Sequence, residues 1–584
     1  MSVNIAKPII KQIKDSRDAL DFFETVSLPA EDEKTQKIIM NFPTVYIHNW
    51  QESGNFEVYV GESNDIFKRT RQHYDAASDK KRWQSKLVEK DASLFIIGHE
   101  HFNKSLTLDI ENRLMHYMMS VDRVKHVHNL RDNPQTSYYP MEELDDIFRK
   151  IWKGLRRENK ELFPTESKIK DSAIYKASPL HKLTKDQEKA RDLIIQKVFK
   201  AIDNGETKQL IFIDGEAGTG KTVLNSSTFY ELYCLAEENN KELSCHLLVN
   251  HDEQITVYEQ IADKLGLTEK YGKVVSKPTT FINNHTEDDP VDVAFIDEAH
   301  LLLTQGKQSY RGENQLKDII DRAKVTVVMF DENQILTTEQ FWEAQILEKY
   351  RSQAKLGNNY IVFDKQLRMQ VNPETMDWID SFTKLGQLKK IPKDLGGYSI
   401  KVFDTPENLD IEIQKKAKDG DSELSRVIAT YDWEYSSINK PPNHLLKYWE
   451  VLIGTWHKPW NRELESELSR KEKREIRGLA WAEQPQTIKE VGSTFTIQGF
   501  DLNYAGVILG PSVKYRNGKI IFDPSASHND KAIRNRTLSD GTKQKFGQTL
   551  IQHEVRVLMT RGVNGMYIYA CDPELRQALL EAAK

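Results

Sequence analysis

Residues 215–222, GEAGTGKT, fit the phosphate-binding pattern G-x-x-x-x-G-K-[ST]. Its glycines let the backbone approach phosphate oxygens without a Cβ in the way, and the N–H groups that open the following helix attract an anion. We expect Lys221 to reach the β- and γ-phosphates of ATP and the Thr222 hydroxyl to hold Mg²⁺. The glycines in this prediction are Gly215, Gly218 and Gly220.

Two further strand ends carry side chains suited to the same reaction. The apolar run VAFI is followed by Asp297 and Glu298, and the run VTVVMF is followed by Asp331 and, three residues later, Gln334. A carboxylate at a strand tip can hold the Mg²⁺ shell, and a second one beside it can polarise the attacking water. We therefore expect Asp297 to hold Mg²⁺, Glu298 to act on the water, and Gln334 to sense the γ-phosphate.

The order of the surrounding segments predicts how these residues are held. From residue 181 onward, strand-like runs alternate with helical stretches, which implies an α/β class with parallel sheets. About 400 residues exceed the needs of one sheet, so we expect two lobes. The predicted parts are 1–40, a helical lead-in; 41–140, a small α+β domain; 141–180, a helical connector; 181–350, the first lobe; and 351–584, the second lobe with an insertion at about 430–490.

Composition narrows the class of protein. The 584 residues are 39% hydrophobic and 29% charged with a net charge of −6, which excludes a collagen-like or wholly disordered chain and a uniformly basic coat. Nucleic-acid binding stays compatible because it needs only a local basic groove. There is no run of roughly 18 apolar residues, so we expect no membrane span. The start lacks the apolar core of a secretory signal, and three scattered cysteines are typical of reduced thiols, so we expect a cytoplasmic protein.

Seven elements along residues 181–584 follow the order of the motifs of superfamily 1 helicases. They are Gln187 in LTKDQ, the phosphate-binding loop, Asp297-Glu298, Asp331 with Gln334, Arg368 in KQLRM, Gln498-Gly499 in STFTIQGFD, and Arg561 in VLMTRG. The segments IATYDWEYS, GSTFTIQGFDLNYAGVILG and LMTRGVNGMYIYACDP resemble the DUF2075 family, which is similar to the helicase-like domain of the larger Schlafen proteins.

This resemblance implies two RecA-like lobes with ATP bound between them. It also implies that Gln187 reads adenine and that Arg368 and Arg561 reach the γ-phosphate, where an arginine contributes about 10³–10⁵ in rate. Gln498 and Gly499 complete the implied nucleotide site.

The segment from about residue 41 to 140 carries a second series of residues. Thr44-Val45-Tyr46 and Tyr59-Val60-Gly61 are strand-like, and they are followed by Arg69, His73, a helical Glu111 and Asn129. This series resembles the GIY-YIG nuclease family, although Thr44 stands where that family has its first glycine.

The nuclease resemblance implies a role for each residue. Tyr46 or Tyr59 would orient or deprotonate the attacking water, and Arg69 would neutralise the charge of the transition state. His73, one helical turn after Arg69, would share its face. Glu111 would bind Mg²⁺, or Mn²⁺, with water completing the shell. Asn112 or His126 is an alternative to Asn129 in this series.

Two further features allow more than one interpretation. The tryptophans of the distinctive second-lobe segment either stack exposed bases or pack the core of the lobe, and the core interpretation is favoured. They are Trp433, Trp456, Trp460 and Trp481. The basic run Lys80–Lys86 either adds phosphate contacts or forms a solvated face.

Together these patterns predict a nucleic-acid-dependent ATPase coupled to a metal-dependent phosphodiesterase, with DNA preferred over RNA as the substrate. By analogy with other fusions of a nuclease to a motor, antiphage defence is the hypothesis for its role. The first alternative is an ATP-gated nucleic-acid-binding switch with an inactive N-terminal domain. The second is an RNA-directed nuclease-helicase. Oligomerisation and further protein partners are left open.

Overall fold

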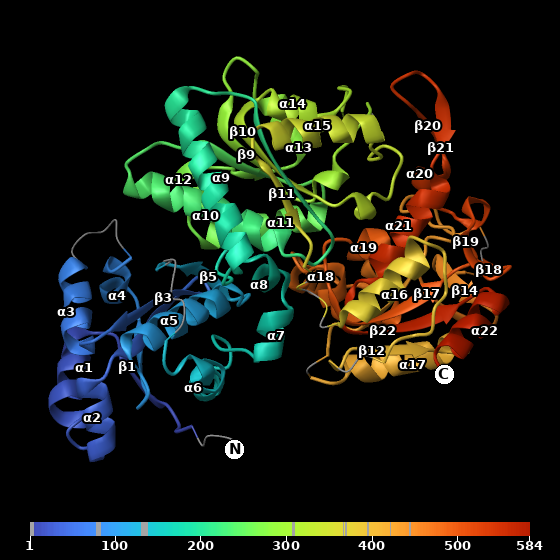
Figure 1. The fold of residues 1–584 in the computed structure, drawn as a ribbon. Helices are drawn as coiled ribbons and strands as arrows, with labels where there is room; N and C mark the ends of the chain where they lie inside the picture. The colour runs from blue at the N-terminus through green and yellow to red at the C-terminus, as the bar shows by residue number, and fades with distance from the viewer. Residues whose placement is uncertain are drawn as a thin grey trace. The chain divides into compact units, whose positions relative to one another are not determined.

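The structure is a computed structural model of the chain. It describes residues 5–77, 83–129, 138–306, 310–365, 367, 369, 371–393, 396–420, 422–442 and 446–584. The chain divides into two compact units, Met1–Lys182 with Val257–Val274, and Leu183–Thr256 with Val275–Lys584. We call them the N-terminal unit and the helical-crossover unit (Figure 1). No helix in these described ranges is long and apolar enough to cross a lipid bilayer.

The N-terminal unit is built on one five-stranded sheet of order β1-β4-β2-β3-β5. Its strands are β1 (Ile9–Lys14), β2 (Thr44–Glu52), β3 (Asn55–Ser63), β4 (Ser93–Gly98) and β5 (Val124–Val127). Neighbouring strands are antiparallel except β5, which runs parallel to β3. Alternate residues of β2 enter two separate cores, with Val45 and Ile47 in one and Tyr46 in the other. The sheet thus carries apolar side chains on both faces.

Helices cover both faces of this sheet. Ile110 and Leu114 of α5 belong to the core that contains Val45, whereas Phe67 of α3 belongs to the core that contains Tyr46. The helical elements of the unit are α1 (Arg17–Phe22), η1 (Phe23–Ser27), α2 (Glu33–Asn41), α3 (Ile66–Ala76), α4 (Ser85–Glu89), α5 (Lys104–Met119), η2 (Met141–Glu143), α6 (Leu144–Glu158), α7 (Glu166–Asp171), α8 (Ala173–Ala177) and α12 (Leu267–Tyr271). Helix α11 (Asp252–Lys264) ends in this unit.

The prediction that residues 1–40 are a helical lead-in is wrong for Ile9–Lys14, which form the edge strand β1. The sequence IIKQIK supplies apolar side chains to both faces, because Ile9 and Ile13 pack with the core of Tyr46 and Ile10 packs with the core of Val45. Strand β1 pairs with β4 from Ile9 opposite Gly98 to Lys14 opposite Ser93. This pairing brings the next residue, Asp15, into the unit's interior.

The helical-crossover unit contains two separate parallel sheets. The first has the order β11-β6-β10-β9-β7-β8 and the second β12-β22-β17-β13-β16, with every pairing parallel. The first sheet comprises β6 (Gln209–Gly215), β7 (Cys245–Leu248), β8 (Val275–Ser276), β9 (Val291–Ile296), β10 (Ala323–Phe330) and β11 (Tyr360–Phe363). The second comprises β12 (Ser399–Val402), β13 (Arg426–Ala429), β16 (Val491–Gly492), β17 (Leu502–Leu509) and β22 (Gly562–Ala570). The predicted α/β class with two parallel-sheet lobes is confirmed.

The crossover helices and small hairpins complete this unit. The helical elements are α9 (Lys185–Asn204), α10 (Lys221–Glu238), α13 (Pro278–Asn284), η3 (Ala299–Leu301), α14 (Gln315–Ile320), η4 (Glu332–Gln334), α15 (Ala344–Leu356), α16 (Pro373–Thr383), α17 (Pro406–Ala417), η5 (Glu463–Glu467), α18 (Arg470–Glu475), η6 (Trp481–Glu483), η7 (Pro485–Lys489), α19 (Thr494–Ile497), η8 (Pro524–Ala526), α20 (Asp530–Ile533), α21 (Gly547–Met559) and α22 (Pro573–Ala582). The hairpins pair β14 (Glu450–Ile453) with β15 (Trp456–Pro459), β18 (Val513–Arg516) with β19 (Lys519–Phe522), and β20 (Asn535–Thr537) with β21 (Lys543–Lys545).

The tryptophans of the second-lobe insertion are mostly interior. Trp456 and Trp460 belong to one buried core, and Trp433 packs against that core while half-exposed. Trp481 is fully buried and donates its indole N–H to Glu490 at 3.2 Å. Because their faces are packed against protein, Trp456, Trp460 and Trp481 pack the lobe rather than stack bases, as the favoured interpretation predicted.

Candidate functional site

The phosphate-binding loop joins the end of β6 to the start of α10. Gly218 and Gly220 have φ values of +84° and +82°, a left-handed backbone that glycine adopts without steric cost. The Lys221 ammonium donates to the carbonyls of Gly215 at 2.5 Å and Glu216 at 2.9 Å, so it lies over the loop. Thr222 follows in the first turn of α10. The loop therefore has the backbone and the lysine that a phosphate-binding site needs.

Gln187 lies directly against this loop. It sits in the first turn of α9, where it forms a capping box with Thr184. Its amide Nε2 donates to the Gly220 carbonyl at 3.1 Å, and a Cβ at Gly220 would lie 2.2 Å from the same nitrogen. The contacts with Thr184 and with the Gly220 carbonyl thus hold Gln187 beside the loop. A side chain at position 220 would displace it.

Asp297 and Glu298 follow the buried strand β9, as expected. Asp297 is 1% exposed. Glu298 has a φ of +47°, a left-handed conformation that is unusual for a residue with a side chain and that clusters at functional sites. Its carboxylate lies 3.5 Å from Gln254 Nε2 and 3.5 Å from His300 Nε2. The fold thus holds an acidic pair at this strand end in a backbone geometry that packing must stabilise.

A chain of hydrogen bonds centred on Gln334 joins the two lobes. Gln334 donates to Asp331 Oδ2 at 2.9 Å and accepts from Arg561 Nη2 at 2.8 Å. Gln498 donates to the Gln334 carbonyl at 3.0 Å and lies 3.4 Å from His300. Residues more than 200 positions apart, Gln334 and Arg561, are therefore in direct contact. The end of β10 and the second lobe are thus linked by direct hydrogen bonds.

Several of these charged groups shift the pKa of His300. Burial lowers the pKa of His300, the carboxylates of Glu298 and Asp331 oppose this, and the charges of Lys221 and Arg561 lower the pKa further. A neutral imidazole can accept a hydrogen bond, which suits its contact with the Gln498 amide. The side chains around His300 thus come from the phosphate-binding loop, from β9, from β10 and from the second lobe.

Two predicted residues, Arg368 and Gly499, have not yet been placed. Arg368 lies outside the described residues. Its neighbour Leu367 donates its backbone N–H to the Gly218 carbonyl at 2.7 Å, so Leu367 lies against the loop. Gly499 has a φ of +86° and contacts Gln254, because a Cβ there would lie 2.2 Å from the Gln254 amide.

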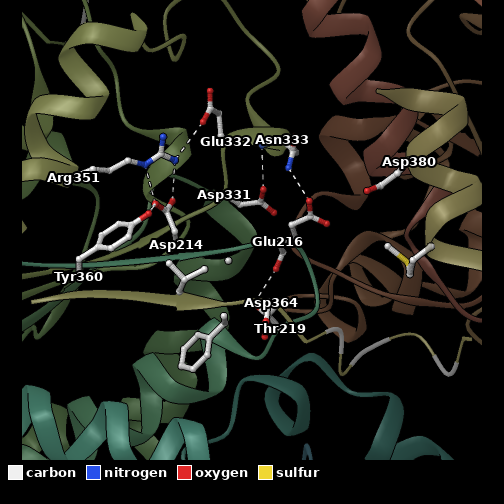
Figure 2. A pocket seen from close by; sticks show the side chains of 14 residues that line it. Asp214, Glu216, Thr219, Asp331, Glu332, Asn333, Arg351, Tyr360, Asp364 and Asp380 are labelled. Carbon is white, nitrogen blue, oxygen red and sulfur yellow. Dashed lines mark hydrogen bonds and ion pairs between the residues drawn. The ribbon is translucent and has the colours of Figure 1, made fainter. Parts of the chain in front are cut away.

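A cavity of about 560 Å³ opens beside the loop, at the carboxyl ends of β6, β10 and β11 (Figure 2). Carboxylates dominate its lining, including Asp214, Glu332 and Asp380. Arg351 bonds Asp214 with two nitrogens and also contacts Glu332. The lining also includes Gly215, Glu216 and Thr219 of the phosphate-binding loop.

The N-terminal unit gathers its own predicted residues on one face of the sheet. The Tyr46 hydroxyl lies 3.1 Å from His73 Nε2, and the Tyr46 and Tyr59 rings stack at 6.2 Å. Arg69 lies near both tyrosines, close enough for its charge to lower the pKa of Tyr46. Gly61 allows this packing, because a Cβ there would lie 2.4 Å from Tyr46 Cζ. The two tyrosines, the arginine and the histidine are therefore one cluster.

Burial sets the charge of this cluster. It raises the pKa of Tyr46 well above its usual value, and the neighbouring Tyr59 adds to this while Arg69 opposes it. Burial, with the charges of His48 and Arg69, lowers the pKa of His73 to about 3. At neutral pH a protonated tyrosine hydroxyl therefore faces a neutral imidazole, so the hydroxyl can donate and Nε2 can accept.

Glu111 and Asn129 form a second group at the end of β3. Asn129 donates one amide hydrogen to Glu111 Oε1 at 2.9 Å and another to the Val60 carbonyl at 2.7 Å. Asn112 is half-buried on α5, and the His126 ring instead lies 4.3 Å from that of His128. Of the three candidates, Asn129 is the one with a contact to Glu111. Within the described ranges, no group of three or more His, Cys, Asp or Glu side chains could hold a metal ion.

Other residues of these sites were not predicted. Asp15 Oδ2 lies 2.5 Å from His48 Nδ1, both side chains are fully buried, and Tyr74 donates to the other Asp15 oxygen at 2.8 Å. His48 shares the strand face of Tyr46, a period-two signal that the sequence offered, whereas Asp15 gave no local signal. Trp83 stacks on Tyr59 at 4.1 Å, but Lys80–Arg82 of the basic run lie outside the described residues.

In the helical-crossover unit the unpredicted residues include His300, Asn333 and Arg556. Arg556 of α21 contacts Glu216 of the phosphate-binding loop, from which it is 340 residues away in the sequence. No periodicity can reveal a pair at that separation.

Comparison with known proteins assigns the larger unit. The sequence profile of "Schlafen group 3, DNA/RNA helicase domain" matches residues 208–572, from β6 to the end of β22. The chain belongs to this family. A protein of Saccharomyces cerevisiae (strain ATCC 204508 / S288c), "Uncharacterized protein YPL245W", is 31% identical over 434 residues, which cover 69% of this chain and 91% of that protein. The unit is therefore a helicase-like P-loop ATPase domain, and we call it the helicase unit from here on.

Solved helicase structures show lower similarity. A structure entitled "Structural Basis for DNA Unwinding at Forked dsDNA by two coordinating Pif1 helicases" has 13% identity and a TM-score of 0.20, and covers 40% of this chain and 58% of that chain. The Pif1 helicase from Candida albicans has 16% identity and a TM-score of 0.21, with 41% and 55% covered. The chain thus spans little more than half the length of these two structures.

Proposed function

We propose that the chain is a nucleic-acid-dependent ATPase coupled to a metal-dependent phosphodiesterase that cuts DNA. The observation that carries the ATPase part is the hydrogen bond from Arg561 to Gln334. It supports a nucleotide site shared by two lobes, because the second-lobe arginine reaches the strand end next to the phosphate-binding loop. In such a site the arginine stabilises the charge that spreads over the transferred phosphoryl group.

The proposed ATPase reaction assigns the described residues as follows. Lys221 leaves the loop carbonyls for the β- and γ-phosphates, and Glu298 orients the attacking water. Thr222 and Asp297 would hold Mg²⁺, whose charge neutralises the phosphate oxygens when it is bound. A hydroxyl and a carboxylate are the oxygen ligands that this ion prefers, so the residues fit the group. Gln334 reports the γ-phosphate to Arg561 and Gln498.

The proposed nuclease belongs to the GIY-YIG type, and its support is the cluster of Tyr46, Tyr59, Arg69 and His73. Tyr46 or Tyr59 orients or deprotonates the attacking water, and Arg69 neutralises charge on the phosphate. The contact of the Tyr46 hydroxyl with His73 Nε2, at 3.1 Å, holds this oxygen in place. Glu111, oriented by Asn129, would hold the divalent cation that assists the leaving oxygen, Mg²⁺ or Mn²⁺.

The test is cleavage of labelled single- and double-stranded DNA and RNA with Mg²⁺, with and without ATP. We expect Glu111→Ala to abolish cutting while ATPase survives, and Lys221→Ala to abolish ATPase. Asn129→Ala should reduce cutting, whereas Asn112→Ala on the same helix as Glu111 should not. Nucleic-acid-stimulated ATPase without cutting on any substrate would instead support an ATP-gated binding switch. Cutting of RNA alone would support an RNA-directed enzyme.

The proposed cellular role is restriction of foreign nucleic acid, with antiphage defence as its bacterial form. Its support is the analogy with other motor–nuclease fusions. Expression of the protein should lower phage plating or the survival of incoming DNA, and Glu111→Ala should restore both. Equal plating with wild type and variant would contradict the role without touching the enzymatic proposal.

A further inference from the structure

The Glu216 carboxylate is a meeting point of three elements around the phosphate-binding loop, and Figure 2 shows its contact with Asn333. Arg556 of α21 donates to it at 2.5 Å, Lys384 after α16 at 2.7 Å, and Asn333 of η4 at 3.2 Å. These residues lie far from Glu216 in the sequence, at separations from 117 to 340 positions. One loop side chain therefore contacts both the strand end that carries Gln334 and the second lobe.

The backbone of the same residue holds the phosphate-binding lysine. The Glu216 carbonyl accepts from Lys221 Nζ at 2.9 Å and from Thr219 Oγ1 at 2.9 Å. When Lys221 moves onto a bound phosphate it leaves this carbonyl, and the loop at Glu216 must adjust. The carboxylate belongs to the same residue as that carbonyl. A movement of the Glu216 backbone therefore changes the contacts of its carboxylate with Arg556 and Lys384.

Arg556 is well placed to pass such an adjustment on. Its side chain is 6% exposed and also contacts the Asp380 carboxylate of α16. Lys384 joins the same carboxylate at 3.1 Å, so two cations and two anions form a closed cluster. Arg556 lies in α21, which ends at Met559, only two residues before Arg561. A shift of Arg556 therefore moves the segment that carries the γ-phosphate arginine.

The charge of Glu216 adds a reason for this contact. A carboxylate in a phosphate-binding loop repels the anionic nucleotide unless cations neutralise it. Two of its three donors, Arg556 and Lys384, are cations. Nucleotide affinity should then depend on Arg556, although Arg556 belongs to none of the predicted motifs.

We propose that Glu216 and Arg556 are a positioning pair that couples nucleotide binding at the loop to the second lobe and thereby sets Arg561. The inference deepens the proposed ATPase function and rests on it. We assign neither side chain a contact with the phosphates or with the attacking water. It acts through the loop at one end and through α21 at the other.

A second ion pair provides a matched control. Arg534, just after α20, contacts the Glu339 carboxylate, and Glu339 follows β10 in the sequence of the first lobe. Arg534→Gln removes an arginine–carboxylate contact between the same two lobes, and among the described residues the side chain of Arg534 contacts Thr338 and Glu339 rather than the loop. If Arg556 acts only by holding the lobes together, the two substitutions should have the same effect.

The experiment measures the affinity of the full chain for a fluorescent ATP analogue, and kcat and KM for ATP with saturating single-stranded DNA. We expect Arg556→Gln to weaken nucleotide binding about tenfold, about 1.4 kcal/mol, because Glu216 is left less neutralised. The double variant Glu216→Gln with Arg556→Gln should regain affinity within about threefold of wild type, yet keep a lowered kcat. Arg534→Gln should change affinity less than twofold, and Arg556→Lys should rescue part of the loss.

The outcomes separate the inference from the function on which it rests. If wild type neither binds nor hydrolyses ATP, the proposed function fails. If wild type is active but Arg556→Gln matches Arg534→Gln, or if the double variant does not regain affinity, the positioning pair is wrong. Should Arg556→Gln fail to fold, Glu216→Gln alone decides: unchanged or tighter binding with a lowered kcat supports the pair, and an unchanged kcat overturns it.

Discussion

The two candidate sites are built in opposite ways. The helicase unit assembles its site from residues between Gln187 and Arg561, and charged and amide groups join the parts by single hydrogen bonds. The N-terminal unit assembles its site on one small sheet, where the rings of Tyr46, Tyr59, His73 and Trp83 pack within 4.1–6.2 Å. The first arrangement suits a site that opens and closes with its lobes, and the second a site that is rigid before substrate arrives.

This difference predicts how substitutions act. Removing a group from the helicase site should reduce rate far more than stability, since polar contacts at a lobe interface contribute little net free energy. Removing a group from the N-terminal site should reduce both, because its residues are also core residues. Measuring rate and stability together for each variant therefore distinguishes the two sites.

The largest effect is expected at Arg561. Arg561→Gln should lower the kcat of ATP hydrolysis by about 10³-fold or more, because the transferred phosphoryl group loses its second-lobe cation. The measurement is steady-state ATPase with saturating nucleic acid, alongside thermal unfolding. Arg576→Gln is the control, since Arg576 bonds Tyr569 and Ala570 within the same lobe. A loss below tenfold, or an equal loss in the control, would contradict the proposed role.

The next effect is expected at the buried Asp15–His48 pair. Asp15→Asn should lower the stability of the N-terminal unit by about 3–5 kcal/mol, because two buried hydrogen bonds of the Asp15 carboxylate, with His48 and Tyr74, are disrupted. Hydrogen exchange of β2 amides in the full chain would measure it. Asp21→Asn is the control: it breaks a partly exposed contact to Arg71 and should cost about 1 kcal/mol or less. Equal exchange in both variants would show that Asp15 is not a stability determinant.

A buried carboxylate of the helicase unit gives the third test. Glu554 of α21 accepts from Tyr431 N at 2.8 Å, and burial, with the charge of Asp432, raises its pKa to about 8. The protonated form is favoured on folding, so its stabilising contribution is complete below pH 4.5 and is lost as pH rises through about 8. Glu554→Gln should therefore stabilise the protein at pH 9, on the order of 3 kcal/mol, and change little at pH 5.

Thermal unfolding at the two pH values checks this prediction. Glu574→Gln on the exposed face of α22 is the control and should show no such pH dependence, because its side chain is 61% exposed. A Glu554→Gln variant whose melting temperature tracks wild type at both pH values would mean that Glu554 is ionised in the folded protein.

Sequence patterns recovered most of the helicase unit, for a physical reason. Buried parallel strands are continuous apolar runs, such as VAFI before Asp297, and the phosphate-binding loop must follow one of them. Gln334 could be predicted because it lies four residues after Phe330, the end of β10. Contacts between lobes were not found, since the Glu216–Arg556 pair depends on how two sheets meet and leaves no local pattern.

The N-terminal unit was recovered in part. Its tyrosines, Arg69 and His73 lie within one hairpin and one helix, so their spacing carries the information. Strand β1 was missed because a six-residue edge strand with three polar side chains is weakly patterned. Asp15 was missed for the same reason, because its position follows from the pairing of β1 with β4.

The smallest change that probes the rigidity of the N-terminal site is the addition of a methyl group at Gly61. A Cβ at this position would lie 2.4 Å from Cζ and 2.5 Å from the hydroxyl of Tyr46. Tyr46 cannot move aside easily, because its ring is fully buried and its hydroxyl meets His73. Gly61→Ala should therefore cost about 1–3 kcal/mol of stability, typical of overpacking. It should also reduce cutting, because the hydroxyl leaves its partner.

Gly154 of α6 offers the matched comparison within the same unit. A Cβ there would lie 2.3 Å from Cδ1 of Ile10, the far end of a half-buried side chain that can change its rotamer. Since alanine also favours a helix by about 0.8–1.0 kcal/mol over glycine, Gly154→Ala should be neutral or stabilising. Hydrogen exchange would measure the stability of both variants. Gly154→Ala places its Cβ against the movable end of Ile10, whereas Gly61→Ala places its Cβ equally close to the fixed ring of Tyr46. If Gly61→Ala were equally well tolerated, the tyrosine cluster would be adaptable, and the contrast between a rigid N-terminal site and a moving helicase site would fail.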